Sequence, residues 1–479
     1  MAAVVDPQTP SDVEHENATR VVWQLAWPAV ALNSLQVVNT LLDRFFIGHL
    51  SQAALTAHGG SLNLMFLMFS LGVAIATGAT ALVSRAFGAN QPHEFREASR
   101  QSLSLTIAFS VVLSLATALG ARAFSGFILP REDVAAAAEM TSFLLVYATG
   151  MPAIYGIQTL AGALRGVGDT KSPMVISGMQ ILLHILLNYV LIFPSHRIGS
   201  FIVPGADLGL IGAALAISIS AWIAVFAYMA HLPKTPLGSL WRIAVPHLSW
   251  AWRILRIAFP AAIQAALRVF SLMAFTLILA SAPQGSAAIA AMSVGFAIEG
   301  IMFMPSFGLS AAAGALVGQS LGMGRPDRAE RLAWISGHHA ALVTLALAGP
   351  IYLLAPQIAT TLVENKPAIS DQATVLLRYL CLTEVMFAYA MVMLGAMQGA
   401  GDTKRPLWIT VFSLWGMRVP LAFFLTFAAG DVVGYGWAIP VGVGLGTTGA
   451  WISMSITQAV TGFLSIVAFR DGKWKTMEV

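Results

Sequence analysis

One apolar segment near the start of the chain carries a stripe of polar side chains that ends in a carboxylate. Asn33, Gln36, Thr40 and Asp43 follow one another at intervals of three and four residues, so a helix places them on one face. A charged side chain at the centre of a bilayer costs roughly 2.5–3.5 kcal/mol, and a carboxylate avoids that cost by taking up a proton. We expect the stripe to line a cavity and Asp43 to carry a proton. The alternative is an ordinary interfacial helix end, with Asp43 beside Arg44.

A second polar pair lies further along the first half of the chain. His184 and Asn188 are four residues apart, so they share one face of a helix. Histidine is the side chain that ordinarily changes charge near neutral pH. A role in proton transfer and a satisfied histidine in the core are equally compatible with this spacing.

The second half places four ionisable side chains near the centres of apolar segments, and their formal charges cancel: Arg268, Glu299, Glu384 and Arg418. One interpretation is a salt-bridged cluster that holds this half together. The other is a second cation site, or a pocket in which a carboxylate meets cationic substrates. Glu299 is favoured as the transport residue, because small residues and Met302 share its helix face.

The 20 methionines and 26 phenylalanines favour an adaptable apolar cavity, which promiscuous binding proteins require. We expect Met302, Glu384 and Arg268 to lie along that cavity, together with Asn33, Gln36 and Thr40.

The motifs of ATPases and common hydrolases are absent from the sequence. Lys171-Ser172 lacks the glycine of a phosphate-binding loop, and no Gly-x-Ser-x-Gly elbow occurs. The single cysteine, Cys381, rules out an intrachain disulfide and a multi-cysteine metal site. The adjacent pair His338-His339 favours a solvated helix end over a metal site. We therefore expect no enzyme activity, no cofactor and no bound metal.

The composition is that of a membrane protein. The chain is 57% hydrophobic and only 10% charged, with a mean hydropathy of +0.76. Its net charge of +4 is not gathered into basic blocks with interleaved aromatics, which argues against nucleic acid as a partner. A spanning helix needs about 20 apolar residues. Twelve segments qualify: 21–47, 53–84, 100–121, 134–160, 173–193, 209–231, 252–281, 287–318, 332–354, 370–396, 406–428 and 447–469.

The basic residues predict the orientation of these segments. Eighteen of the 26 Lys and Arg residues fall at the chain ends or in loops of one face, five in loops of the other, and three inside segments. The positive-inside rule then places both termini in the cytoplasm. We expect an all-α membrane protein with a cytoplasmic tail at 1–20, a lobe at 21–231, a cytoplasmic linker at 232–251, a lobe at 252–469 and a tail at 470–479.

A loop that occurs twice reveals an internal duplication. Gly166-Val-Gly-Asp-Thr-Lys-Ser-Pro173 returns as Gly399-Ala-Gly-Asp-Thr-Lys-Arg-Pro406, 233 residues later. Six segments separate equivalent points, so both lobes of six helices have the same orientation, related by a pseudo-twofold axis along the membrane normal. The loop itself favours a structural role, in which Gly ends one helix while Asp and Pro begin the next. A gating role is the alternative.

The chain resembles the multidrug and toxic compound extrusion (MATE) transporters. The resemblance rests on the twin Gly-Asp-Thr-Lys-x-Pro loops and on three further stretches, Leu42–Leu50, Ala81–Asn90 and Leu316–Gly322. It covers nearly the whole chain, and the DinF-like branch is the most similar. The resemblance implies two six-helix lobes, a central cavity and drug efflux coupled to inward H⁺ or Na⁺.

The resemblance also implies roles for particular residues. In DinF-like relatives an acidic residue at the position of Asp43 takes part in cation coupling, with partners on helix five in an Asn-x-x-x-Asp/Asn pattern. This chain departs from that pattern, because His184 stands at the first position and Asn188 at the second. Other branches place acidic residues on helices seven and ten, where this chain has Arg268 and Glu384. A sodium site of that second kind is therefore disfavoured.

The sequence as a whole predicts a multidrug antiporter of a bacterial inner membrane, acting as a monomer among membrane lipids. It would export organic, often cationic, compounds in exchange for H⁺ or Na⁺ by alternating access. We assign cation coupling to Asp43, His184, Asn188 and Glu299. A lipid-linked saccharide flippase is the alternative; it would favour a cationic cavity for pyrophosphate. An intramembrane enzyme would need catalytic residues clustered at one depth, and the sequence offers no such set.

Overall fold

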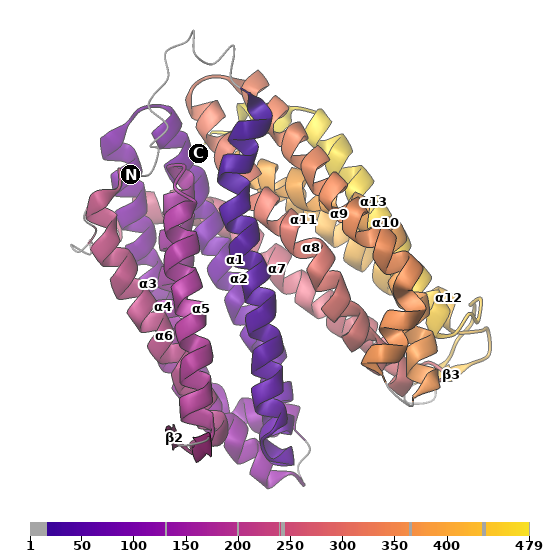
Figure 1. The fold of residues 1–479 in the computed structure, drawn as a ribbon. Helices are drawn as coiled ribbons and strands as arrows, with labels where there is room; N and C mark the ends of the chain where they lie inside the picture. The colour runs from indigo at the N-terminus through magenta and orange to yellow at the C-terminus, as the bar shows by residue number, and fades with distance from the viewer. Residues whose placement is uncertain are drawn as a thin grey trace. The chain divides into compact units, whose positions relative to one another are not determined.

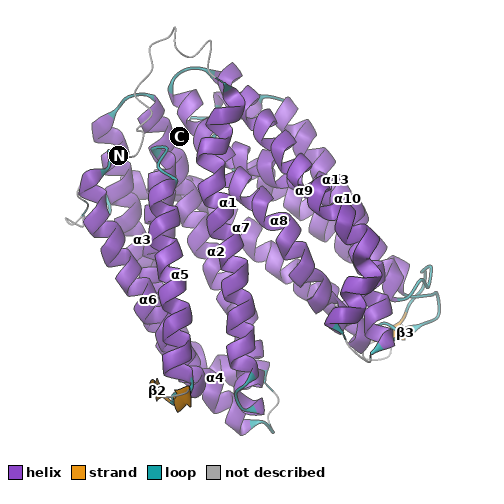
Figure 2. Ribbon diagram, viewed as in Figure 1, coloured by secondary structure: helices purple, strands orange, loops and turns teal. Residues whose placement is uncertain are grey.

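The computed structural model describes residues 17–129, 132–198, 201–238, 240, 245–363, 366–433 and 437–478, and it is almost entirely helical (Figures 1 and 2). Twelve helices within this part of the chain are long and apolar enough to cross a membrane, as the sequence predicts. Most of the predicted N-terminal tail, up to residue 16, and linker residues 239 and 241–244 lie outside the described residues.

The first half of the chain forms six of these helices. They are α1 (Ala18–Gly48), α2 (Gln52–Gly88), α3 (Pro92–Ile128), α4 (Val134–Gly166), α5 (Lys171–Ile192) and α6 (Gly209–His231). A short antiparallel hairpin, β1 (Pro194–Ile198) and β2 (Phe201–Ala206), joins α5 to α6, and its register pairs Pro194 with Ala206. The sequence does not predict this hairpin. A 3₁₀ turn, η1 (Leu232–Lys234), follows α6.

The second half repeats this order. Its helices are α7 (Leu248–Ser281), α8 (Gly285–Gly322), α9 (Pro326–Leu362), α10 (Pro367–Gly399), α11 (Lys404–Thr410), η2 (Val411–Arg418), α12 (Val419–Thr426) and α13 (Thr447–Arg470). The segments α11, η2 and α12 form one continuous rod in which η2 is a π-helix. A two-residue ladder of β3 (Val432–Val433) and β4 (Trp437–Ala438) precedes α13, and a 3₁₀ turn, η3 (Lys473–Thr476), follows it.

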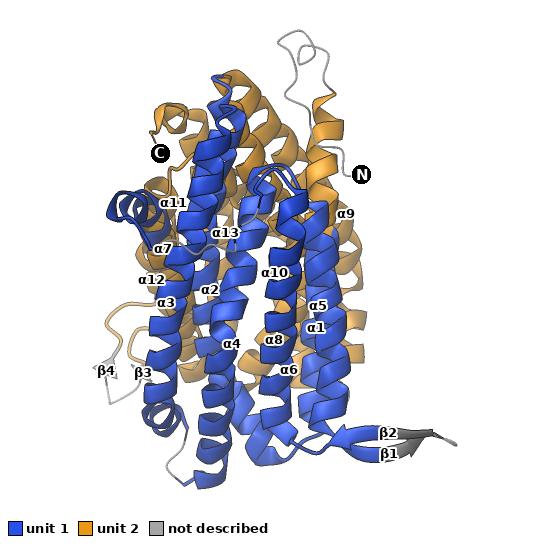
Figure 3. Ribbon diagram, turned by 90° about the vertical axis from the view of Figure 1, so that its left-hand side faces the viewer, with its two compact units in different colours: residues 1–11, 31–259, 322–324 blue, residues 12–30, 260–321, 325–479 orange. Residues whose placement is uncertain are grey.

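The described chain divides into two compact units (Figure 3). Unit 1 contains residues 31–259 and 322–324, and unit 2 contains the rest, including residues 17–30. The divisions therefore fall within the first helix of each half, just after Pro28 in α1 and just before Pro260 in α7. The division predicted from the sequence, with lobes at 21–231 and 252–469 joined by a linker at 232–251, stays a prediction.

The twin loops have the same local structure, and it matches their structural interpretation. Gly168 has φ 84° and Gly401 has φ 90°, a backbone conformation that favours glycine at the end of a helix. The Oδ1 atom of Asp169 accepts from the backbone N–H of Ser172 at 2.9 Å, and the Oδ1 atom of Asp402 accepts from that of Arg405 at 3.3 Å. Each aspartate thus caps the next helix.

Each unit has its own apolar core. The core of unit 1 gathers around Met140, Phe143 and Leu144 of α4. In unit 2 the helices α8 and α10 cross closely where both have a glycine. A Cβ on Gly399 would collide with the backbone of Gly314. Close crossing through small residues is the ordinary way in which membrane helices associate.

Candidate cation-coupling site

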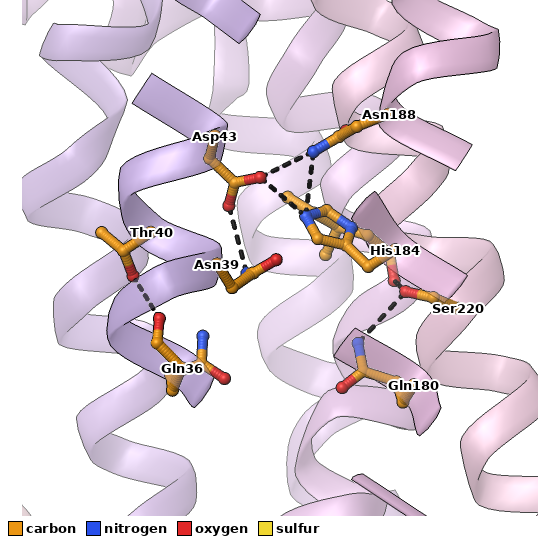
Figure 4. Close-up of polar contacts among 9 residues, drawn as sticks. Gln36, Asn39, Thr40, Asp43, Gln180, His184, Asn188 and Ser220 are labelled. Atoms are coloured by element: carbon orange, nitrogen blue, oxygen red, sulfur yellow. Dashed lines mark hydrogen bonds and ion pairs between the residues drawn. The ribbon is translucent and has the colours of Figure 1, made fainter. Parts of the chain in front are cut away.

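Asp43 is the centre of a hydrogen-bonded cluster inside unit 1 (Figure 4). Its Oδ1 atom lies 3.0 Å from His184 Nε2 and accepts from Asn188 Nδ2 at 2.6 Å. Its Oδ2 atom accepts from Asn39 Nδ2 at 3.3 Å. The Nδ2 atom of Asn188 also lies 3.1 Å from His184 Nε2. The structure therefore brings together three residues that the sequence singled out and adds Asn39.

Helix geometry explains how two helices supply this cluster. Asn39 and Asp43 are four residues apart on α1, and His184 and Asn188 are four apart on α5. Side chains at this spacing lie one above the other on the same helix face. Each helix therefore presents a pair, and the two pairs meet at the Asp43 carboxylate. Asn39 could have been found from its i, i+4 relation to Asp43.

The partners of Asp43 are buried, whereas the carboxylate is partly accessible. His184 is 3% exposed and Asn188 is 1% exposed, but the Asp43 side chain retains 24% exposure. Three further polar atoms of the cluster, Asn39 Oδ1, His184 Nδ1 and Asn188 Oδ1, are buried and have no hydrogen-bond partner among the described residues. The Asp43 carboxylate is therefore open on one side and supported by buried donors on the other.

The pair of Asp43 and His184 can hold one proton in two ways. An ionised Asp43 accepts from a protonated Nε2, and a neutral Asp43 donates to an unprotonated Nε2, over the same 3.0 Å separation. The hydrogen bond can therefore be kept whichever of the two residues carries the proton.

Further polar side chains continue along the same face of α5. Gln180 Nε2 donates to Ser220 of α6 at 3.2 Å (Figure 4), and Ser177 shares a 2.7 Å hydrogen bond with Tyr228 of α6. The sequence analysis did not single out these residues. Their spacing from His184, at four and seven residues, was the available signal.

The other predicted positions on α1 are separate from this cluster. Asn33 is half-buried, whereas Gln36 and Thr40 are exposed. The Thr40 hydroxyl donates to the backbone carbonyl of Gln36 at 3.0 Å (Figure 4). These side chains leave α1 with a polar face that ends at Asp43.

Glu299 is the centre of a second hydrogen-bonded group, inside unit 2. Gln458 Nε2 of α13 donates to Glu299 Oε1 at 2.9 Å, and Thr383 Oγ1 of α10 donates to Gln458 Oε1 at 2.9 Å. Glu384, next to Thr383, is 1% exposed, and its Oε2 atom has no partner among the described residues. Sequence reasoning missed Gln458 and Thr383, because amides and hydroxyls are common in apolar helices and carry no charge to mark them.

The salt-bridged cluster considered for unit 2 does not form as direct pairs. In the part of the chain that the structure describes, none of Arg268, Glu299, Glu384 and Arg418 makes an ion pair with another of the four. Arg418 instead donates from Nε to Thr457 at 3.0 Å. Arg268 is half-buried on α7. Met302 is fully buried in a small cluster with Ala348 and Cys381, so it has no accessible surface in this conformation.

In the part of the chain that the structure describes, twelve helices that are long and apolar enough to span a membrane form two repeated halves, and each unit holds hydrogen-bonded ionisable groups. This arrangement is typical of a multi-pass membrane transporter. Comparison with known proteins agrees. The MatE family model matches the chain twice, over residues 28–190 and 260–424, once in each half.

Curated relatives and solved structures match over almost the full length. The chain is 29% identical to a probable multidrug resistance protein NorM of Thermotoga maritima, covering 95% of this chain and 93% of that protein. It is 26% identical to a probable multidrug resistance protein NorM of Acinetobacter baylyi, covering 84% and 88%. A solved multidrug resistance MATE family transporter in its outward-facing conformation superposes with a TM-score of 0.84 at 20% identity, covering 97% and 98%.

The chain belongs to the MATE family, as the twin loops and the three further stretches predicted. Members of this family are transporters and not enzymes. Assignment to the DinF-like branch stays a prediction.

Proposed function

We propose that the protein is a multidrug efflux antiporter of the bacterial inner membrane, with both termini in the cytoplasm. It exports organic, often cationic, compounds in exchange for H⁺ by alternating access, and Asp43 is the group that binds and releases the proton. The observation that carries this proposal is the cluster in which His184 and Asn188 meet the Asp43 carboxylate at 3.0 and 2.6 Å. The relatives that are named as multidrug resistance proteins support the substrate class.

The donors around Asp43 favour H⁺ over Na⁺ as the coupling ion. His184 and Asn188 present nitrogen atoms to the carboxylate, and both can donate hydrogen bonds to it. Hard cations prefer oxygen ligands, and an imidazole nitrogen next to the carboxylate is a poor substitute. An imidazole is, in contrast, a good partner for a carboxylate that gains and loses a proton.

Coupling in unit 1 follows from the charge of Asp43. Protonation on the outer side neutralises Asp43 and favours the conformation that releases the drug. Deprotonation on the inner side restores the charge and favours reloading. A ligand shifts such an equilibrium only by its difference in affinity for the two states, so the proton and the drug must each prefer a different one.

We assign the remaining residues to supporting roles. Glu299, bonded to Gln458, is a second cation-coupling group, in unit 2. The exposed Gln36 and Thr40 and the half-buried Asn33 give α1 a polar face for substrate. Glu384, Arg268 and Met302 are assigned to the substrate cavity; for the fully buried Met302 this requires a conformation in which it becomes accessible.

Transport by the purified protein in proteoliposomes tests this function. Ethidium efflux is measured under a pH gradient and, separately, under a sodium gradient. We expect the pH gradient to drive efflux and the sodium gradient to have no effect. Efflux driven by sodium alone would reverse the assignment of the ion. No efflux under either gradient, with lipid-linked saccharides accumulating in a deletion strain of unchanged drug sensitivity, would favour the flippase.

A further inference from the structure

The fifth membrane-spanning rod of unit 2 is one residue longer than its counterpart in unit 1. Helix α5 has 22 residues, and the rod of α11, η2 and α12 has 23. Both begin after a threonine with nearly the same backbone angles, Thr170 at φ −99°, ψ −15° and Thr403 at φ −99°, ψ −12°. Both end before a phenylalanine, Phe193 at φ −97°, ψ 156° and Phe427 at φ −99°, ψ 150°. The ends are therefore equivalent, and the additional residue lies between them.

The pattern of burial places the additional residue within or next to the π-helix. Before η2, buried positions correspond at an offset of 233 residues, Pro173 with Pro406 and Ser177 with Thr410. After η2 they correspond at 234, Asn188 with Ala422 and Ile192 with Thr426. A π-turn accommodates one residue more than an α-turn, and such turns occur frequently at functional sites.

Arg418 is the last residue of η2, and when it is counted in the register that follows η2 it corresponds to His184. The same side-chain position therefore carries an imidazole in unit 1 and a guanidinium in unit 2. The acidic partner is different as well. Pro28 and Pro260 set an offset of 232 between α1 and α7, which aligns Asp43 with Phe275. A carboxylate for Arg418 has to come from another helix.

Helix α13 links Arg418 to such a carboxylate. Thr457 accepts from Arg418 Nε at 3.0 Å, and the next residue, Gln458, donates to Glu299 at 2.9 Å. The Arg418 carbonyl, at the end of the π-helix, also accepts from Ser453 Oγ of α13 at 2.9 Å. Two hydrogen bonds thus fix Arg418 on α13, the helix whose Gln458 donates to Glu299 of α8.

We propose that Arg418 is a positioning residue that supplies a fixed positive charge for the Glu299 carboxylate, at the place where unit 1 uses the titratable His184. The inference rests on the proposed function, because it gives Glu299 the task of meeting a cation. Arginine stays protonated at every physiological pH. Unit 2 therefore has a permanent counter-charge, whereas the counter-charge in unit 1 can be gained and lost.

This difference divides the work between the two units. In unit 1, Asp43 and His184 together take up a proton and release it, so their combined charge changes during transport. In unit 2, the fixed positive charge of Arg418 keeps Glu299 ionised, so that this carboxylate stays available to an organic cation. The two units of the duplicated chain therefore contain different kinds of charged site.

Equilibrium binding of ethidium to the purified full-length protein tests the proposal without any gradient. We expect Arg418→Met to weaken binding about tenfold at neutral pH and to move the acid-side loss of binding to higher pH. Removal of the positive charge makes Glu299 easier to protonate, and a protonated Glu299 no longer attracts the dye. Arg418→Lys should restore most of the affinity, because it keeps the charge.

Two further variants separate positioning from folding. In a Glu299→Gln background, Arg418→Met should cause no additional loss and no shift with pH, because the carboxylate that it serves is gone. The matched control is Arg378→Met, which removes an exposed arginine of the same unit from the ring of Tyr352 and should leave binding unchanged.

The proposal is overturned if Arg418→Met binds ethidium with wild-type affinity and pH dependence. It is also overturned if the double variant loses affinity by the product of the losses in Arg418→Met and Glu299→Gln. Failure of the proposed function looks different. In that case the wild-type protein itself does not bind ethidium, or proton-driven efflux is absent while the coupling between Arg418 and Glu299 is intact.

Discussion

Asp43 and His184 are 141 residues apart in the chain, and the carboxylate Oδ1 of one lies 3.0 Å from the ring Nε2 of the other. The two side chains come from α1 and α5, and each is supported from its own helix by an asparagine, Asn39 and Asn188. A proton that enters this cluster can reside on either residue. The pH dependence of transport should therefore belong to the pair and not to a single carboxylate.

The first prediction replaces the imidazole while a hydrogen-bond donor is kept. His184→Asn leaves a side chain that can still donate to Asp43 but removes the titratable nitrogen. We expect efflux to continue. The dependence of the efflux rate on pH, measured in proteoliposomes across a pH series, should become that of a single titrating group. His184→Ala is the control, and it should reduce efflux further because Asp43 loses that donor. An unchanged pH profile in His184→Asn would show that the ring plays no part in proton exchange.

The second prediction concerns the shortest hydrogen bond of the cluster. Asn188→Ala removes a buried donor that lies 2.6 Å from Asp43 Oδ1. Hydrogen bonds to charged groups contribute about 1.5–3 kcal/mol. We expect proton-driven efflux to fall by about tenfold or more, because the ionised form of Asp43 loses this support. Asn39→Ala is matched to it and should have a smaller effect, since its bond is 3.3 Å long. Equal effects of the two variants would contradict the account.

The sequence predicted the twelve helices and the duplication because both depend on simple patterns. Runs of apolar residues define the spans, and the twin loops fix the offset. Asp43, His184 and Asn188 could be grouped because the family resemblance paired α1 with α5. The hydrogen-bonding roles of Gln458 and Thr383 could not be predicted in this way, since an amide or hydroxyl in an apolar helix is equally compatible with packing.

The correspondence of Arg418 with His184 also required the structure. The loop offset of 233 residues aligns His184 with Met417, and only the π-helix shows that one more residue must be counted. The hairpin of β1 and β2 was missed because Pro194 and Gly205 within its strands are residues that disfavour strand assignment.

The third prediction separates a structural role of Glu384 from a transport role. This side chain is 1% exposed, and its Oε2 atom has no partner among the described residues. Glu384→Gln keeps the shape and removes the charge, so we expect thermal stability in detergent to be unchanged or higher. Glu384→Ala should lower it, because a cavity is left. If Glu384 meets cationic drugs, Glu384→Gln also slows ethidium efflux. A large loss of stability in Glu384→Gln would instead show that the charge of Glu384 stabilises the folded protein.

The fourth prediction concerns the C-terminal residues. Trp474 of η3 is fully buried; its ring stacks on Phe469 at 4.7 Å between centroids, and its Nε1 atom donates to the Phe469 carbonyl at 2.7 Å. Trp474→Ala should lower the free energy of unfolding by about 3–5 kcal/mol, as large buried side chains do when truncated. Thermal unfolding in detergent measures this. Lys473→Ala, at a position that is 69% exposed, serves as control and should be neutral. Equal melting temperatures for both variants would show that η3 does not stabilise unit 2.

The central claim is that Asp43 is the group whose protonation drives export. Asp43→Asn keeps the size and hydrogen-bonding capacity of the side chain and removes its ability to exchange a proton. The decisive measurement is ethidium efflux from proteoliposomes under an imposed pH gradient, with ethidium binding checked to show that the variant is folded. The account predicts that Asp43→Asn binds ethidium and that its pH-driven efflux falls to the rate of liposomes without protein. Efflux at the wild-type rate would contradict it.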